Sequence, residues 1–290
     1  MRVAAVGHVE WVEFAEVARV PRPGEIVNAR RVWSEPAGGA AVAAVQLAKL
    51  AGGEGLFFTS LGDDELGHAA KRGLEELGLT VHVAWRDDHP TRRAFTYVDD
   101  EAERTITVIG PRLEPRGDDP LPWEGLGDVD ACYFTAGDAD AVRAARSARA
   151  LVATARVMPV LQEASVPLDA VVGSGADAKE RYVDGMLEPA PKYVVRTAGA
   201  RGGEWVGQEG RTGRWQAAEL PGPRADAYGC GDSFAAGLTY GLGDARGIAA
   251  ALDLGALCGA YCFTGHGPYE RQLQDADIAQ GTPAKSPRAS

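Results

Sequence analysis

The sequence predicts an α/β fold in which a mainly parallel central sheet carries helices on both faces. Short apolar runs with strand character alternate with longer runs whose apolar residues recur at helical spacing. Runs of this length can serve as the crossover connections that parallel strands require. With 290 residues the chain is long for one small domain and short for two large ones, so we expect one α/β domain with a modest appendage.

The predicted elements follow one another along most of the chain. Apolar runs predict strands at 3–6, 56–59, 81–85, 131–134, 170–172 and 193–195. Helical periodicity predicts helices at 40–50, 67–77, 139–155, 231–241 and 248–263. In the second of these helices, Ala70, Leu74 and Leu77 share one face, and Gly78 follows as a stop signal.

Two segments in the first half interrupt this alternation. Residues 11–33 and 92–109 contain extended, part-polar stretches with no helical pattern between them, and 99–100 has the character of a hairpin turn. We expect these segments to form a small antiparallel β-sheet that stands off the main body as a lid. The single domain, lid included, is predicted to span 1–274, and the polar segment 275–290 is predicted to be a poorly ordered tail.

Composition and charge exclude several classes of partner. Thirty basic and 41 acidic residues give a net charge of −11, which argues against nucleic acid as a partner. No apolar run approaches the ~18 residues needed to cross a bilayer, and the apolar stretch at 1–7 is too short for a signal peptide. We therefore expect a cytoplasmic protein that binds no membrane. The four cysteines are predicted to be free thiols rather than a disulfide framework.

The most informative stretch is a glycine-rich turn that opens a helix, at 226–238. Gly229 and Gly231 bracket Cys230, and small and apolar residues at helical spacing follow at once. Such a turn points free backbone N–H groups outward, and the helix dipole adds about +0.5 charge at that end, which makes an anion site suited to phosphate. Asp232 lies in the first turn, where it can take a proton from an alcohol while the amides hold a phosphoryl group. The alternative is an ordinary helix with an acidic first turn.

This stretch resembles the C-terminal signature of the PfkB, or ribokinase-like, carbohydrate kinases. Residues 226–232 align in the same frame with the family pattern Asp-Thr-x-Gly-Ala-Gly-Asp, with Ala227 and Cys230 in place of its Thr and Ala. Further matches follow in the expected order: Pro-x-Pro-Gly-Glu at 21–25, Gly-Gly at 38–39, Gly-x-Asp-x-x-Gly at 62–67 and Thr-x-Gly-x-x-Gly at 197–202. The resemblance therefore extends over nearly the whole chain.

The resemblance implies a ribokinase-like fold, a mainly parallel sheet with a β-sheet lid. It also implies transfer of the γ-phosphate of ATP, with Mg²⁺, to an alcohol of a small sugar, sugar derivative or nucleoside. By motif position, Asp232 is the general base, and the backbone N–H groups of Gly229, Cys230 and Gly231 form the anion hole. Asp226 falls where some members of the family hold a monovalent cation such as K⁺.

The resemblance also places the nucleotide and the magnesium ion. Thr197, Gly199 and Gly202 would lie along the nucleotide. The Asn-x-x-Glu element that the family has near Mg²⁺ falls at 174–177, where both ends differ. Asp177 is consequently the residue predicted on the magnesium side.

The sequence departs from the family at the substrate end. The Asp with which family members grip sugar hydroxyls falls at Val12, and the Lys-Gly-Ala-Asn that often follows Gly38-Gly39 is replaced by the apolar residues 40–43. An unpaired polar group buried in a site costs about 1–3 kcal/mol. These residues therefore suit a less polar substrate, or one that is held by other side chains.

Five residues are the predicted contacts to the substrate. Glu10, Trp11, Gly38 and Gly39 are assigned to substrate binding, and His8 is a further candidate. For Trp11 the alternative is that it packs the lid or a dimer interface, and His8 is equally interpreted as a structural histidine.

Arginines of the predicted lid leave two interpretations open. Arg92, Arg93 and Arg104 either form a solvated face or, if one of them reaches the pocket, indicate a phosphorylated substrate.

Two functions of different classes remain open. An ATP-dependent kinase of a small alcohol explains the glycine-rich turn and its acid. A ligand-sensing or regulatory protein on the same fold, with weak or no kinase activity, explains the missing polar substrate residues. We favour the kinase, because a protein that only binds a ligand has no need of Asp232. An exposed edge of the lid would also let two lids pair, so we expect a homodimer.

Overall fold

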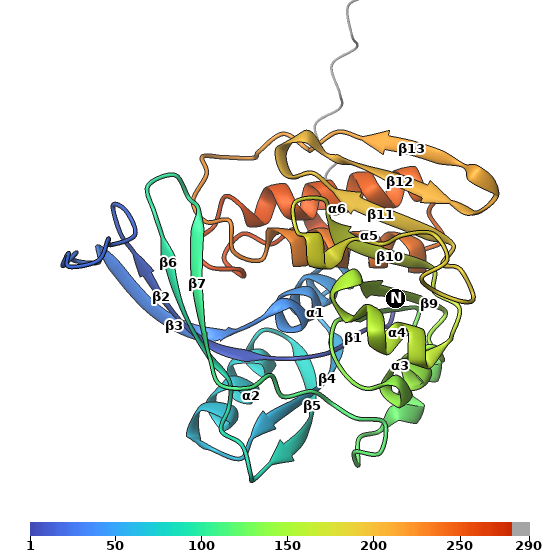
Figure 1. The fold of residues 1–290 in the computed structure, drawn as a ribbon, viewed down its shortest axis with the longest axis horizontal. Coiled ribbons are helices and arrows are strands. Elements are labelled where there is room, and N and C mark those ends of the chain that lie inside the picture. Colours follow the sequence, from blue (N-terminus) through green and yellow to red (C-terminus); the bar gives the residue numbers. More distant parts are fainter. Residues whose placement is uncertain (280–290) are drawn as a thin grey trace, which may run out of the picture.

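A nine-stranded sheet forms the body of the computed structural model, which describes residues 1–279 (Figure 1). In order across the sheet the strands are β13 (Thr212–Trp215), β12 (Gly203–Gly207), β11 (Tyr193–Thr197), β10 (Ala170–Ser174), β9 (Ala150–Thr154), β8 (Ala131–Phe134), β1 (Val3–Val6), β4 (Gly55–Gly62) and β5 (Leu79–Arg86). Neighbours from β11 through β5 pair in parallel, whereas β12 pairs antiparallel with both β11 and β13. The predicted mainly parallel sheet is therefore confirmed.

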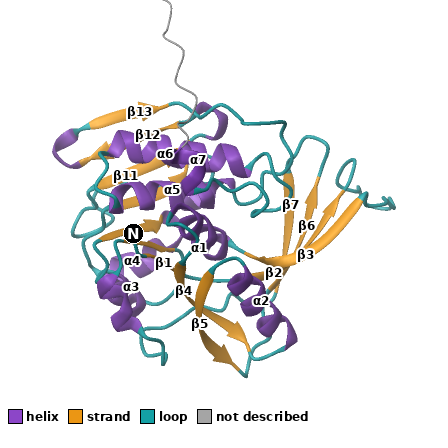
Figure 2. Ribbon diagram, turned by 180° about the vertical axis from the view of Figure 1, so that it is seen from behind, coloured by secondary structure: helices purple, strands orange, loops and turns teal. Residues whose placement is uncertain are grey.

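Helices cover both faces of this sheet (Figure 2). One face carries α1 (Gly39–Leu50), α2 (Glu65–Glu76), α5 (Cys230–Gly243) and α6 (Ile248–Cys262), and the other carries α3 (Ala139–Ala145) and α4 (Met158–Ala164). Within β1, Ala5 packs with α1 while Ala4 and Val6 pack in the cluster that contains α3 and α4. Because both faces of the strand are buried, β1 is apolar throughout.

Short helices complete the described secondary structure. The 3₁₀ helices are η1 (Trp123–Asp128), η2 (Ala155–Val157), η3 (Ala178–Glu180), η4 (Gly199–Arg201) and η5 (Gln208–Gly210). Among residues 1–279, none of the helices combines the length and the apolar character that crossing a membrane requires.

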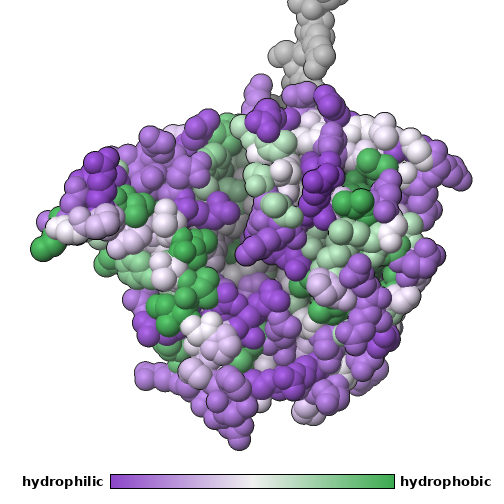
Figure 3. All heavy atoms as spheres, in the orientation of Figure 1, coloured by the Kyte–Doolittle hydropathy of each residue, from purple (hydrophilic) through white to green (hydrophobic). Residues whose placement is uncertain are grey.

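A separate four-stranded sheet stands off the body as a lid (Figure 1). Its order is β3 (Arg31–Ala37), β2 (Glu10–Glu16), β6 (Arg93–Val98) and β7 (Arg104–Ile109). The lid is mixed, and the expectation of an antiparallel sheet is wrong for its central pair, because β2 and β6 pair in parallel. Both strands leave the same carboxyl edge of the body, β2 after β1 and β6 after β5, and so they run in the same direction. Figure 3 shows the surface hollowed between the lid and the body.

The lid ends in an edge strand. All six residues of β7 are exposed, and among the described residues the strand pairs with β6 alone. Such an edge can accept another strand. The homodimer through the lid stays a prediction.

One predicted helix is wrong in its second half. The helix expected at 139–155 ends with α3 at Ala145, and 150–154 forms β9 instead. All five residues of β9 are buried between two parallel neighbours, so the strand is apolar and alanine-rich on both faces. A continuous run of this kind cannot be distinguished from a buried helix by periodicity.

The end of the chain also differs from the prediction. Residues 275–279, which the sequence placed in a poorly ordered tail, form the short helix α7 (Asp275–Ala279). The rest of that predicted tail, 280–290, lies outside the described residues.

Truncating Leu74 tests the packing of α2. This side chain is fully buried against the sheet beside Ala70, so we expect Leu74→Ala to lower the free energy of unfolding by about 2–5 kcal/mol. Chemical denaturation measures the change. Glu76→Ala, an exposed position of the same helix, is the control and should change it by less than about 0.5 kcal/mol. Equal effects of the two substitutions would contradict the assigned face.

Candidate active site

The carboxyl edge of the parallel strands around β1 is the candidate active site. β1 pairs with β8 on one side and with β4 on the other, so the strand order reverses at β1. Ligands of open α/β sheets bind at such switch points. Gly7 follows β1 and lies against Ala40 of α1 and Thr135 after β8. Gly39, the first residue of α1, lies in turn against Asp232 of α5. The N-termini of two helices therefore meet at this edge.

The first turn of α5 offers free backbone amides. Gly229 precedes the helix with φ 78°, and a Cβ there would lie 2.9 Å from Val42 and 3.0 Å from Pro268, so the position requires glycine. The first helical hydrogen bond runs from Ser233 N–H to Gly229 C=O, at 2.8 Å. The amides at 230–232 donate to no described residue, and no side chain caps the helix. This geometry fits an anion-binding site.

Asp232 lies beside these amides in the first turn of α5. A Cβ built on Gly39 would lie 2.7 Å from the Oδ1 atom of Asp232, so the carboxylate packs against the start of α1. Burial raises the pKa of Asp232 to about 6, although the positive charges of Arg104 and Arg156 act in the opposite direction. The carboxylate is therefore mostly ionised near pH 7 and still basic enough to accept a proton.

Asp226 holds the glycine-rich turn in place. Its side chain is fully buried, and its two carboxylate oxygens accept hydrogen bonds from the backbone N–H of Tyr228, at 2.8 Å, and of Gly267, at 3.1 Å. Asp226 thus joins the turn to the loop that follows α6. Both oxygens are engaged by the protein itself.

The lid contacts the same turn. Between β6 and β7, the C=O of Ala102 accepts a hydrogen bond from Ala227 N–H at 3.0 Å. Arg104 at the start of β7 donates from Nη1 to the C=O of Ala227 at 3.1 Å. The lid is therefore attached to the residue that precedes Tyr228 and the anion site.

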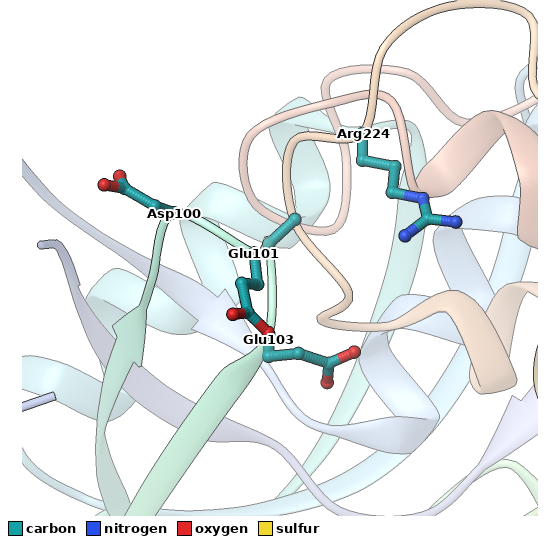
Figure 4. Close-up of a pocket in the computed structure, with 5 residues that line it drawn as sticks. Asp100, Glu101, Glu103 and Arg224 are labelled. Carbon is teal, nitrogen blue, oxygen red and sulfur yellow. The ribbon is translucent and has the colours of Figure 1, made fainter. Parts of the chain in front are cut away.

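A cavity lies beside this attachment (Figure 4). It has a volume of about 380 Å³ and is lined by Asp100, Glu101, Ala102 and Glu103 of the lid turn, with Arg224 opposite them. Asp232 is not among its lining residues. This cavity is consequently separate from the carboxylate that the sequence singled out.

The residues predicted along the nucleotide lie at the carboxyl end of β11. Thr197 ends the strand, Gly199 begins η4, and Gly202 closes the turn into β12. Gly202 has φ 78°, and a Cβ there would collide with the C=O of Trp215, so this turn requires glycine. Thr197 C=O accepts a hydrogen bond from Gly175 N–H at 2.8 Å, which brings the turn beside the end of β10.

The segment predicted to lie near magnesium is followed by an acid that the sequence analysis missed. Asp177 is partly buried, and Glu180, three residues further on, accepts a hydrogen bond from Ser174 N–H at 2.6 Å. Arg156 after β9 bridges the two carboxylates, at 3.0 Å to Asp177 and 2.5 Å to Glu180. Of the two acids, Glu180 is the one whose charge raises the pKa of Asp232. Its side chain enters the site from η3, outside the segment where the family motif was expected.

The residues predicted to contact the substrate lie in the segment after β1 and at the start of α1. Glu10 is 7% exposed, and its Oε1 atom lies 3.8 Å from His8 Nε2 and 3.0 Å from Arg92 Nε. Gly38 packs against the His8 ring, and its N–H donates to the hydroxyl of Tyr228 at 3.2 Å. The structure therefore brings Glu10, Gly38 and Gly39 together near Asp232.

Trp11 lies apart from these residues. It alternates with Glu10 and Val12 along β2, so its side chain is on the opposite face of the lid. Its cross-strand partner Pro36 contacts Gly73 of α2, which places this face against α2. The structure does not bring Trp11 to the site.

Cys230 contributes its amide rather than a reactive thiol. A hydrogen bond with the Cys262 thiol, together with burial, raises the pKa of Cys230 well above its usual value. A protonated thiol is a poor nucleophile. The four cysteines are free, as predicted.

Comparisons with known proteins agree with this architecture. Residues 1–172 match the family model described as pfkB family carbohydrate kinase. The ATP-dependent ribose-1-phosphate kinase of Halopiger xanaduensis is 26% identical over 294 residues, which cover 96% of this chain and 97% of the relative.

Solved structures show the same fold at low identity. The ribokinase of Thermotoga maritima superposes with a TM-score of 0.76 at 18% identity, covering 96% of this chain and 98% of that chain. The ribokinase of Arabidopsis thaliana, complexed with ribose and ATP, gives a TM-score of 0.74 at 16% identity. The match covers 96% of this chain and 97% of that chain. The predicted ribokinase-like fold is confirmed.

Replacing Tyr228 by Phe tests the link between the two helix starts. The change removes the hydroxyl that accepts from Gly38 N–H in a buried position, so we expect the free energy of unfolding to fall by about 1–3 kcal/mol. Tyr97→Phe, on the outer face of the lid, is the matched control, because no described residue bonds to the Tyr97 hydroxyl. Denaturant unfolding of both variants gives the comparison, and a loss in Tyr97→Phe of the same size would argue against the link.

Proposed function

The chain belongs to the pfkB family of carbohydrate kinases, and we propose that it transfers the γ-phosphoryl group of ATP to a hydroxyl of a small sugar, sugar derivative or nucleoside. The observation that carries this proposal is the position of Asp232 beside the unpartnered amides of 230–232. A base and an anion site at one helix start supply the two groups that phosphoryl transfer to an alcohol requires.

Asp232 is the proposed general base. Its carboxylate accepts the proton of the acceptor hydroxyl as the oxygen attacks the γ-phosphorus. The raised pKa, about 6, makes it a stronger base than an ordinary aspartate while leaving it ionised near pH 7. Gly39 beside the carboxylate leaves room for the acceptor, because any Cβ there would collide with Oδ1.

The start of α5 is the proposed anion hole. The N–H groups of Cys230 and Gly231, with the turn at Gly229, face the negative charge of the transferring group. A Cβ built at Gly231 would meet nothing within 4 Å, so this position faces open space from which a phosphate can approach. Arg104 and Arg156 add positive charge on either side.

ATP is proposed to bind along Thr197, Gly199 and Gly202, with Mg²⁺ held from the side of Asp177 and Glu180. Magnesium is commonly bound in such sites by one or two carboxylates together with substrate phosphates, which fits this pair. When bound, the ion would neutralise phosphate charge. Arg156 lies between the two carboxylates and forms an ion pair with each of them.

For a monovalent cation the fit at Asp226 is poor. Each of its carboxylate oxygens already accepts a backbone N–H group, and among the described residues Asp226 belongs to no cluster of three or more His, Cys, Asp or Glu side chains that could hold an ion. We therefore derive no step that involves K⁺.

The acceptor is proposed to be a pentose or a related sugar. The curated relative is named for ribose-1-phosphate, a sugar that already carries a phosphate. Apolar Val12, where sugar-binding members of the family carry an Asp, argues against a neutral polyol bound through hydroxyl contacts alone.

Asp232→Asn tests the base. The substitution removes the proton acceptor and keeps the shape, so we expect kcat to fall by about 10²–10⁴-fold, with thermal stability no lower than that of the unchanged protein. Release of ADP in the presence of a panel of sugars and nucleosides measures kcat. Asp253→Asn, an exposed position on α6, is the control and should retain full activity. Substantial activity in Asp232→Asn would refute the assignment.

The pH dependence provides a second test. Because the base must be ionised, we expect kcat/KM to be constant well above pH 6 and to fall about tenfold per pH unit below it. Arg104 favours the ionised carboxylate, so Arg104→Ala should move the inflection to higher pH. A pH–rate profile of both proteins measures the inflection. An unchanged inflection would show that Arg104 does not act on Asp232.

A further inference from the structure

A buried polar cluster beside the site is built around Glu10. Its carboxylate lies between Arg92, which precedes β6, and His8, which follows β1. The side chains of Glu10, His8 and Arg92 are only 9%, 15% and 17% exposed. The cluster thus lies where the lid joins the body, next to the start of α1.

Several polar atoms of this cluster have unused hydrogen-bonding capacity. Within residues 1–279, His8 Nδ1 is buried without a partner, and the Arg92 Nε–H is close to Glu10 but not aligned with it. Arg112 follows β7, whose last residue Ile109 pairs with Arg93. The Arg112 side chain is 34% exposed and donates from Nε to Glu114. The terminal amino groups of Arg92 and Arg112 donate to no described residue. Because buried polar groups nearly always have partners, the buried His8 Nδ1 and Arg92 Nε indicate a group that residues 1–279 do not supply.

The charges around His8 indicate that the missing group is an anion. Burial, together with the positive charges of Arg112, Arg92 and Arg156, lowers the pKa of His8 to about 3. His8 is consequently neutral near pH 7. Beside the Glu10 carboxylate, the charges that act on this cluster are those of the Arg92 and Arg112 guanidinium groups. The planar forks of two arginines with free terminal amino groups suit a phosphate, which they bind through parallel hydrogen bonds.

The cluster lies on the acceptor side of the base. Arg156 is bonded to Asp177 and Glu180, and Arg104 to the turn before α5, whereas Arg92 lies beside Glu10 and the Arg112 charge acts on both His8 and Glu10. Gly38 packs against His8, and Gly39 packs against Asp232. Consecutive Cα atoms are only about 3.8 Å apart. A single sugar ring can therefore reach from the base to the cluster.

We infer that Arg92 and Arg112, together with His8, bind a phosphate monoester group of the acceptor, so that the enzyme phosphorylates a sugar that already carries a phosphate. The inference rests on the proposed function, because Asp232 must act on a hydroxyl of the same molecule. The acceptor oxygen forms a bond to the γ-phosphorus, the bond from that phosphorus to the β,γ-bridging oxygen breaks, and the hydroxyl proton passes to Asp232. The products are ADP and a sugar bisphosphate.

Steady-state kinetics with matched acceptors test this inference. Ribose, ribose 1-phosphate and ribose 5-phosphate are the probes, and we expect at least one phosphate ester to exceed ribose in kcat/KM by about 100-fold or more. Arg92→Ala and Arg112→Ala should each raise KM for that ester by about 10- to 100-fold and leave KM for ATP unchanged.

The neighbouring arginine supplies a matched control. Arg93 bonds to Glu13 on the outer face of the lid, at 2.6 Å, and its side chain is 45% exposed. Arg93→Ala should leave KM for the ester unchanged. Arg92→Lys retains the positive charge but loses the planar guanidinium group, so it should raise KM for the ester less than Arg92→Ala does. If Arg92→Ala and Arg93→Ala behave alike, or if ribose is used as well as its esters, the inference is wrong.

Binding without turnover separates this inference from the proposed function. Calorimetry with Asp232→Asn and the phosphate esters, in the absence of ATP, should give binding that Arg92→Ala in the same background weakens by about 10-fold or more. Such arginine-dependent binding with no ADP release by the unchanged protein would refute the proposed function and support the phosphate site. ADP release that depends on Asp232 but not on Arg92 or Arg112 would support the function and overturn the phosphate site.

Discussion

The free amides at the start of α5 are the feature on which the rest of the site depends. An N–H group left without a partner costs free energy, so the fold must hold the turn in shape through other contacts. Asp226 supplies these contacts by accepting two backbone N–H groups, and Gly229 supplies the backbone conformation that starts the helix. The turn is thereby rigid, while its amides at 230–232 remain available to a ligand.

Hydrogen bonds and aromatic packing connect the lid directly to the anion site. The lid turn bonds to both backbone groups of Ala227, through Ala102 and Arg104. Deeper in the lid, Phe14 of β2 packs edge-on against Tyr228, whose hydroxyl accepts from Gly38 at the start of α1. A displacement of the lid would therefore be transmitted to the turn before α5 and to the start of α1 together. This arrangement would couple binding of the proposed acceptor to the position of the amides at 230–232.

The sequence could predict the parts of the site that are local. Short spacings in the sequence mark the glycine-rich turn, the acid in the first turn of the following helix and the Gly38-Gly39 pair. The structure brings Gly39 against Asp232 in that turn. Glu180 and Arg156 could not be found in this way, because a contact between η2 and η3 joins them and no motif marks it. The strand β9 was misread for a related reason: its alanine-rich residues are buried on both sides, and burial is a property of the whole sheet.

Charge also accounts for the apolar residues at the predicted substrate end of the site. Val12 is fully buried next to Phe14 in the cluster that contains Tyr228, so a carboxylate there would lie in apolar surroundings close to the acid Glu10. A hydrogen bond to a charged group contributes about 1.5–3 kcal/mol, compared with about 0.5–1.5 kcal/mol for a neutral one. An acceptor anchored by its phosphate therefore needs fewer hydroxyl contacts to bind in one orientation. On the inferred assignment, the apolar residues at 12 and 40–43 and the terminal amino groups of Arg92 and Arg112 belong to a single arrangement, in which contacts to a phosphate take the place of contacts to sugar hydroxyls.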